Sequence, residues 1–143
     1  MGIALAKELS NQGAEVKLVL GPVAEMPEIP NCQVLNVQTA QQMFDASMDV
    51  FPSCNGAFLA AAVADYTIDN PKISKIKRTS DNLRLSLKPT KEIAAHVGRM
   101  KATSQFLVGF ALETDNEMEN AKGKLERKNF DAIVLNSLND AGA

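Results

Sequence analysis

The sequence is poor in the residues that most often build metal, redox and hydrolytic sites. It contains no Trp, one His and two Cys among 143 residues. Cys32 and Cys54 lie far apart, with no Cys-x-x-Cys pair and no His nearby, which fits buried thiols in a reducing compartment better than a disulfide or a zinc site. No Ser/His/Asp set, HExxH pattern, Walker motif or pair of His ligands can be assembled. We therefore expect no protein-built metal site.

Charge and hydropathy exclude two further classes of protein. The formal net charge is −2, and there is neither a basic arm nor an interleaving of aromatic and basic residues, so nucleic-acid binding is not expected. The longest apolar run, over residues 56–64, is shorter than the roughly 18 residues that a membrane span needs. No basic segment followed by an apolar core opens the chain, so export is not expected. These features predict a soluble, cytoplasmic protein with one domain over residues 1–143.

The spacing of apolar residues alternates between helical and strand-like periods. We expect helices over residues 2–11, 39–48, 91–100 and 114–128, and strands over 16–20, 32–37, 56–63, 83–87, 106–110 and 132–135. Capping boxes at Thr39/Gln42 and Thr114/Glu117 and an N-cap at Thr90 support the helix starts. The alternation predicts a Rossmann-like α/β fold, an open and mostly parallel sheet with helices on both faces.

The order of the elements is unusual at its start. A doubly wound domain normally opens with a strand and a glycine-rich phosphate turn before its first helix, whereas this sequence opens on a helix. We interpret the sequence as an incomplete domain. The continuous apolar run over residues 56–63 is typical of a strand that is covered on both faces of a parallel sheet.

Ligands of open α/β sheets bind beyond the carboxyl ends of the strands, and several polar residues are expected there. Asp65 follows an apolar run and is either a loop-initiating residue that bonds neighbouring amides or an acceptor for a ligand hydroxyl or amine. The basic residues between positions 72 and 78 are either a solvated face or a mobile flap that closes over phosphates. Lys124 and Lys128 share one helix face, which is also typical of a solubilising pair.

Three blocks follow one another in a characteristic order: Ala61-Ala62-Val63-Ala64-Asp65-Tyr66, Lys75-Ile76-Lys77-Arg78 and Gly109-Phe110-Ala111-Leu112-Glu113-Thr114. With them the chain resembles the phosphopantothenate–cysteine ligase family, also called phosphopantothenoylcysteine synthetase. In many bacteria this ligase is the C-terminal half of the bifunctional coenzyme A biosynthesis flavoprotein. The resemblance covers essentially all 143 residues.

The resemblance implies a ligase that joins the carboxylate of 4′-phosphopantothenate to the amine of cysteine. Most bacterial members use CTP, which activates the carboxylate as an acyl-cytidylate with loss of pyrophosphate, and the eukaryotic branch is associated with ATP. Cations and Mg²⁺ are needed to neutralise the phosphates that meet in the cleft. The resemblance also implies a cytoplasmic homodimer with a flavin-dependent decarboxylase, fused or separate, as its partner.

Carried over position by position, the resemblance implies catalytic roles for Lys75, in a flap over about residues 66–82, and for Ala62. The implied nucleotide contacts are Leu59, Ala60, Ala61, Asp65, Lys75, Lys91, Glu92, Ile93, Ala94, Phe110, Lys124 and Lys128. Thr90-Lys91-Glu92 departs from the Asn-Pro-Asp of many relatives. The family's Asn-x-Ser-Ser-Gly-Lys turn is expected immediately before Met1 and a further tail after Ala143, so the fragment alone is expected to be inactive.

Two other functions remain open on the residues alone. One is a Rossmann-type NAD(P)-binding oxidoreductase domain that lacks its glycine loop. Against it, Leu20-Gly21-Pro22 offers no acidic residue where a dinucleotide ribose is usually held. The other is a non-catalytic α/β domain that is retained for assembly beside a flavoprotein.

Overall fold

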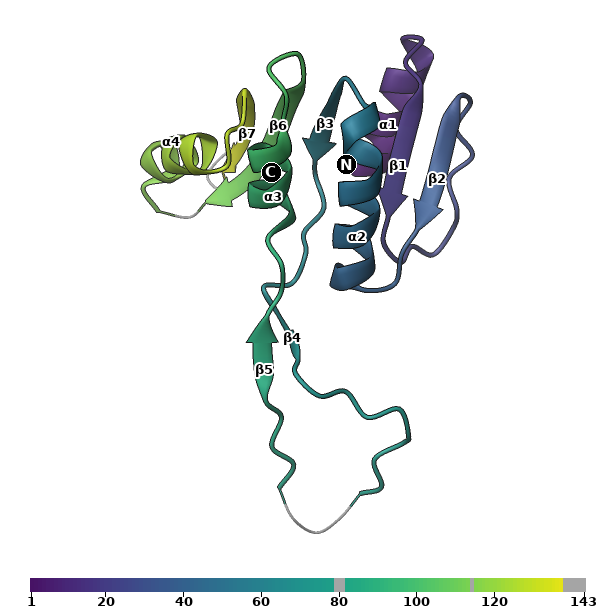
Figure 1. Cartoon of the computed structure of the whole chain (residues 1–143), viewed down its shortest axis with the longest axis vertical. Helices are drawn as coiled ribbons and strands as arrows, with labels where there is room; N and C mark the ends of the chain where they lie inside the picture. Colours follow the sequence, from purple (N-terminus) through teal and green to yellow (C-terminus); the bar gives the residue numbers. More distant parts are fainter. Residues whose placement is uncertain (79–81, 114, 138–143) are drawn as a thin grey trace.

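The computed structural model describes residues 1–78, 82–113 and 115–137. Its elements, in chain order, are α1 (Gly2–Asn11), β1 (Val16–Leu20), β2 (Cys32–Asn36), α2 (Ala40–Val50), the 3-10 helix η1 (Phe51–Ser53), β3 (Gly56–Leu59), β4 (Tyr66–Ile68), β5 (Leu87–Pro89), α3 (Ile93–Met100), β6 (Phe106–Glu113), α4 (Glu117–Arg127) and β7 (Ala132–Ser137). Figure 1 shows two groups of parallel strands side by side, with a long ribbon extending away from them.

The strands form two parallel groups and one antiparallel ribbon. β1 pairs with β2, and β6 lies between β3 and β7. In Figure 1, α2 lies in front of the strands and α1 behind them. The predicted α/β class with mostly parallel strands is therefore confirmed. Among the residues described, no helix has the length and hydropathy that a bilayer crossing requires.

The core lies under α3 and between β6 and α4. Its buried residues come from four separate places: Phe51 in η1, Val97 in α3, Leu107 in β6, and Phe130 just after α4. Leu107 is 0% exposed. Gly109 on β6 has the Phe130 ring against its Cα, where any side chain would collide with the ring. The absence of a side chain at this position therefore lets α4 and β6 pack closely.

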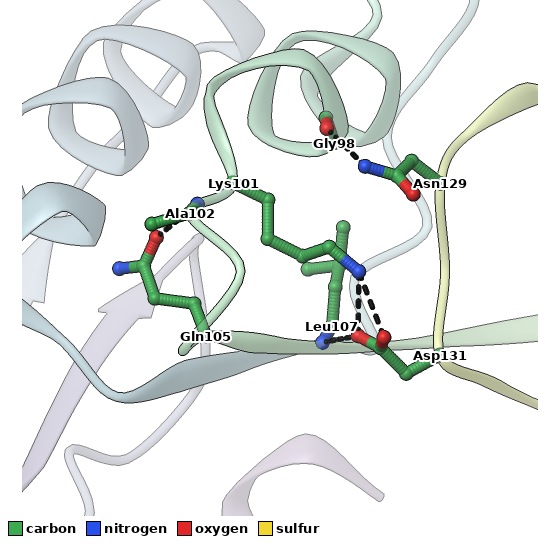
Figure 2. A network of polar contacts seen from close by, with 7 residues as sticks. All are labelled: Gly98, Lys101, Ala102, Gln105, Leu107, Asn129 and Asp131. Atoms are coloured by element: carbon green, nitrogen blue, oxygen red, sulfur yellow. Dashed lines mark hydrogen bonds and ion pairs between the residues drawn. The ribbon is translucent and has the colours of Figure 1, made fainter.

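A polar network fixes the edge of this core (Figure 2). The Asp131 carboxylate accepts a 2.6 Å hydrogen bond from the Leu107 backbone N–H and binds the Lys101 ammonium at 2.8 Å. The hydrogen bond from Lys101 lowers the pKa of the Asp131 carboxyl, and the Leu107 N–H lowers it further. Gln105 donates to the backbone oxygens of Phe51 and Cys54. The ends of α3, β6 and β7 are thereby joined to η1.

The two strands of the ribbon, β4 and β5, are antiparallel. Tyr66 lies opposite Pro89, and Ile68 lies opposite Leu87. The strand expected over residues 83–87 is wrong in its bounds, because β5 covers only Leu87–Pro89. Side chains on the ribbon are exposed on both faces, so the alternation of leucines before Leu87 has no sheet to pack against.

Of the three helix caps expected from the sequence, one is confirmed. The Thr39/Gln42 capping box is present at the start of α2. The expected N-cap at Thr90 is wrong, because α3 begins at Ile93 with Glu92 as its N-cap. α4 begins at Glu117 with Asn116 as its N-cap, and Thr114, the expected cap, lies outside the described residues.

The strand expected over residues 56–63 is also shorter in the structure. β3 ends at Leu59, where its pairing with Gly109 of β6 stops, and the chain then turns toward the ribbon. Ala61 and Ala62 are exposed, and the residues of β3 are only half-buried. The prediction that both faces are covered is therefore wrong for this run.

Candidate functional site

A large open cleft runs between β1 and β3 and continues past the end of β3 to α3 and α4. Its volume is about 970 Å³, and every residue of β1 and β3 lines it. The site residues expected from the sequence that also line it are Leu59, Ala60, Ala61, Asp65, Lys91, Glu92, Ile93, Ala94, Phe110, Lys124 and Lys128. The structure thus brings four separate segments to one place, and their role as ligand contacts stays a prediction.

The chain that leaves β3 is tied to the chain that enters α3. The Thr90 hydroxyl donates a 2.7 Å hydrogen bond to the backbone oxygen of Ala64, and the Thr90 N–H donates one of 2.8 Å to the backbone oxygen of Asp65. Asp65 itself is exposed, and within the described part of the chain no hydrogen bond to its carboxylate is seen. Of its two sequence interpretations, the structure gives no support to the one in which it bonds neighbouring amides.

Lys91 and His96 both pack against α2. The Lys91 ammonium lies 4.6 Å from the centre of the Phe44 ring, within the range of a cation–π contact. The edge of the His96 ring meets the same phenyl group at 4.9 Å between ring centres. His96 therefore packs against α2, and Lys91 joins the start of α3 to α2.

The C-terminal end of α4 brings positive charge to the cleft. Lys124 and Lys128 lie four residues apart on one helix face, and both line the cleft. Lys128 is the C-cap of α4, and its Nζ lies 2.6 Å from Oε1 of Glu92. The Lys128 side chain is 22% exposed and that of Glu92 is 58% exposed, so this ion pair is partly screened by water.

Lys75 and Ala62, the two residues with expected catalytic roles, are not among the residues that line the cleft. Both are exposed, and Lys75 lies in the segment that joins β4 to β5, away from the parallel strands (Figure 1). Residues 79–81 of the expected flap lie outside the described residues. The catalytic role of Lys75 stays a prediction, and it requires the ribbon to move toward the cleft.

Within residues 1–78, 82–113 and 115–137, no group of three or more His, Cys, Asp or Glu side chains is placed to hold a metal ion. Cys32 and Cys54 are free thiols, as predicted, but both are half-buried rather than buried. Burial raises the pKa of the Cys32 thiol above its usual value.

Comparison with known proteins places the chain in a family. The DNA/pantothenate metabolism flavoprotein C-terminal domain family matches residues 1–143. The chain belongs to this family. A protein named cysteine/cysteine sulfinic acid decarboxylase, from an unknown prokaryotic organism, is 53% identical over 143 residues, which are 100% of this chain and 40% of that protein. The coenzyme A biosynthesis bifunctional protein CoaBC of Haemophilus influenzae is 38% identical over 144 residues, covering 96% of this chain and 34% of that protein.

The fold agrees with this family assignment. The crystal structure of the C-terminal domain of a CoaBC protein matches with a TM-score of 0.80 and 35% identity, covering 94% of this chain and 62% of that one. The family resemblance carried by the three sequence blocks is thus confirmed. The chain spans less than half the length of the two curated relatives named above, 40% of the first and 34% of the second.

The sequence interpretation missed the contact that joins α3 to the end of α4. A side chain at Gly98 would collide with the backbone oxygen of Lys128, and Asn129, at φ 52°, donates from its amide to the Gly98 oxygen at 2.8 Å. A glycine inside an amphipathic helix, with an Asn after the last turn of the next helix, is the available signal. Its partner, however, follows only from the tertiary structure.

Proposed function

We propose that this family domain catalyses the ligation of 4′-phosphopantothenate to cysteine in coenzyme A biosynthesis, with CTP as co-substrate. The family match and the likeness to the C-terminal domain of CoaBC support this proposal. The observation that carries it is the cleft beyond β3, where Lys91, Lys124 and Lys128 gather with Asp65. Three cations at one cleft suit a reaction in which a triphosphate meets a phosphorylated acid.

The reaction has two steps that balance without an oxidant or reductant. A carboxylate oxygen of phosphopantothenate attacks the α-phosphorus of CTP, and pyrophosphate leaves. The cysteine amine then attacks the acyl carbon, CMP leaves with the electrons of the broken C–O bond, and the amine loses a proton. Lys124 and Lys128 would offset the charge that develops on the leaving pyrophosphate.

The magnesium ion would reach the cleft with the nucleotide. Since the described residues hold no acidic cluster, Mg²⁺ would be bound mainly by phosphate oxygens rather than by a protein cage. It would supply further charge neutralisation at the phosphates. Among the residues of the cleft, Asp65 would accept a hydrogen bond from the nucleotide. Phe110 and residues 59–61 would form the wall of the nucleotide site.

The ribbon is proposed to be the flap of this reaction. Lys75 would be carried over the cleft when the ribbon moves, and the small Ala62 would let ligand groups approach the chain beyond β3. One ribbon face presents the apolar side chains of Tyr66, Ile68 and Leu87, which are 61%, 41% and 59% exposed. Such a face supports the further proposal of a homodimer, because exposed apolar patches of this kind often mark protein contacts. The proposed location of this homodimer is the cytoplasm.

The names of the relatives add a partner to the proposal. CoaBC is a bifunctional protein, and the relative from the unknown organism is named as a decarboxylase of cysteine or cysteine sulfinic acid. This chain aligns with 40% of that decarboxylase. We therefore propose that this domain carries out the ligation. Its proposed partner is a flavin-dependent decarboxylase, either fused to it or separate.

Nucleotide binding is the first test. CTP·Mg²⁺, ATP·Mg²⁺ and NADPH are titrated by calorimetry into a complete enzyme that carries residues 1–143, because the fragment alone is expected to be inactive. Pyrophosphate release is then followed with phosphopantothenate and cysteine. We expect a preference for CTP and release that depends on both acceptor substrates. A preference for NADPH would favour the oxidoreductase, and binding of none of the three would favour a non-catalytic partner domain.

A chimaera tests the same residues in a complete enzyme. Residues 1–143 replace the matching segment of the Haemophilus influenzae CoaBC protein, to which they align over 144 residues. We expect the chimaera to restore growth when the host protein is depleted, and the same chimaera with Lys75→Gln to fail. Equal growth with both would contradict the catalytic role of Lys75, and failure of the unsubstituted chimaera to grow would contradict the proposed ligation.

A further inference from the structure

Glu92 stands at the N-cap of α3 without capping that helix. N-cap side chains usually accept a hydrogen bond from an amide of their own first turn, but the Glu92 side chain makes no such bond. Its Oε1 lies instead 2.6 Å from the Nζ of Lys128 at the C-cap of α4. The carboxylate thus acts between two helices rather than within one.

The backbone of Lys128 is held by the same helix, six residues further along α3. The Lys128 carbonyl oxygen lies where a side chain at Gly98 would be, and the Asn129 amide donates to the Gly98 oxygen at 2.8 Å. Position 98 therefore has to be free of a side chain for the end of α4 to reach this place. Figure 2 shows the Gly98–Asn129 contact where α3 passes the end of α4.

The two contacts hold Lys128 at both of its ends. Six helical residues span about 9 Å, a distance that a lysine and a glutamate side chain can bridge together. A free lysine on the surface would sample many rotamers, and ordering it on ligand binding costs conformational entropy. A lysine held at its backbone and at its ammonium has lost most of that entropy before the ligand arrives.

We propose that α3 is the positioning element for Lys128, with Glu92 fixing the ammonium group and Gly98 the backbone. The inference rests on the proposed function, in which Lys128 faces the phosphates of the nucleotide. It changes the role expected for Glu92, whose carboxylate acts on the nucleotide through Lys128 rather than by contact with it. Glu92 and Gly98 are therefore positioning residues.

A double-mutant cycle tests the side-chain anchor. In a complete enzyme that carries residues 1–143, the dissociation constant of CTP·Mg²⁺ is measured for the unsubstituted form, Glu92→Gln, Lys128→Gln and the double variant. Asp49→Asn on α2 is the matched loss of an exposed carboxylate. We expect Glu92→Gln to weaken binding by about threefold to tenfold when Lys128 is present, and to have no further effect in Lys128→Gln. Glu92→Asp, which keeps the charge, should restore part of the affinity.

Lysine reactivity tests the positioning without any nucleotide. The acetylation rate of Lys128 is measured by mass spectrometry, with the exposed Lys122 of the same helix as internal reference. We expect Glu92→Gln and Gly98→Ala to raise the rate at Lys128 relative to Lys122, and Asp49→Asn to leave it unchanged.

The outcomes separate the two proposals. An equal loss of affinity from Glu92→Gln in both lysine backgrounds would overturn the positioning role, because Glu92 would then act on the ligand directly. Tighter binding by Glu92→Gln would overturn it too, because the carboxylate would then compete with the phosphates. An unchanged acetylation rate of Lys128 in Glu92→Gln would overturn it without reference to any ligand. Failure of the complete enzyme with unsubstituted residues 1–143 to bind CTP·Mg²⁺ would instead contradict the proposed function.

Discussion

Asp131 at the start of β7 binds the Lys101 ammonium with both carboxylate oxygens while accepting the backbone N–H of Leu107. Lys101 and Asp131 are thirty positions apart in the sequence. Together with the Leu107 hydrogen bond, their ion pair joins the end of α3 to the starts of β6 and β7. Lys101 is the more buried partner, with its side chain 9% exposed against 48% for Asp131. Loss of the carboxylate would therefore leave a nearly buried ammonium without its counter-charge.

We expect Asp131→Asn to lower the midpoint of urea unfolding, because the Lys101 ammonium loses its charged partner and the Leu107 N–H a charged acceptor. Asp45→Asn, an exposed carboxylate on α2 that bonds only its helix neighbour Gln41 in the described residues, is the control and should leave the midpoint near that of the wild type. A midpoint that falls equally in both variants would contradict the role of this network.

The same carboxyl predicts how stability depends on pH. The pKa of the Asp131 carboxyl is lowered in the folded protein, so the ionised form stabilises the folded state more than the protonated form does. The stabilisation is present above the pKa of the unfolded chain and is lost as pH falls through the lower pKa of the folded protein. In Asp131→Asn we expect less loss of stability on acidification than in the wild type, measured by urea unfolding at pH 7 and at successively lower pH.

Leu107→Ala should be strongly destabilising, because Leu107 is 0% exposed and lies in the core cluster with Phe51, Val97 and Phe130. The lost contacts and the remaining cavity predict a decrease of about 2–5 kcal/mol in the free energy of unfolding. Leu85→Ala, at a ribbon position that is 55% exposed, should change it by less than about 0.5 kcal/mol. Similar losses from the two substitutions would place the core elsewhere.

Asp65→Ala tests the acceptor at the cleft. We expect the dissociation constant of CTP·Mg²⁺ to rise by about tenfold, the size of one lost hydrogen bond to a charged acceptor. Thermal stability should stay near that of the wild type, because Asp65 is exposed. Asp49→Ala, an exposed carboxylate on α2, is the matched control. An unchanged dissociation constant would remove Asp65 from the site.

Lys75→Gln tests the flap. If the ribbon carries this lysine to the reacting phosphates only during turnover, kcat should fall by about a hundredfold while the CTP·Mg²⁺ dissociation constant changes by less than about threefold. Lys75→Arg should keep part of the rate, and Lys7→Gln, an exposed lysine on α1, should keep all of it. Equal losses in kcat and affinity would show that Lys75 only binds.

Much of the fold follows from local chemistry, and for that reason it could be predicted. The Thr39/Gln42 capping box sets the start of α2 within the chain itself, and the run over β1 needs only its β-branched residues and the glycine that ends it. The end of β3 could not be predicted, because Leu59 is the last residue that finds a partner on β6, at Gly109. The sequence near residue 60 stays apolar past that point.

The candidate site shows the same division. The resemblance named eleven of the residues that line the cleft, but the contacts between them depend on how α3 and α4 meet. The pairing of Glu92 with Lys128 and the passage of the Lys128 backbone over Gly98 join residues that are far apart in the sequence. Neither residue pair carries a pattern that indicates its partner.

The two hydrogen bonds that Thr90 makes to Ala64 and Asp65 bring both ends of the ribbon to one point. The ribbon that contains β4 and β5 is therefore a closed loop, because hydrogen bonds join the two chain segments at its base. Because closure entropy rises only slowly with loop length, residues could be added to or removed from the tip at little cost to the rest of the fold. The length and the charge of this ribbon can therefore change in evolution almost independently of the strands and helices to which it is attached.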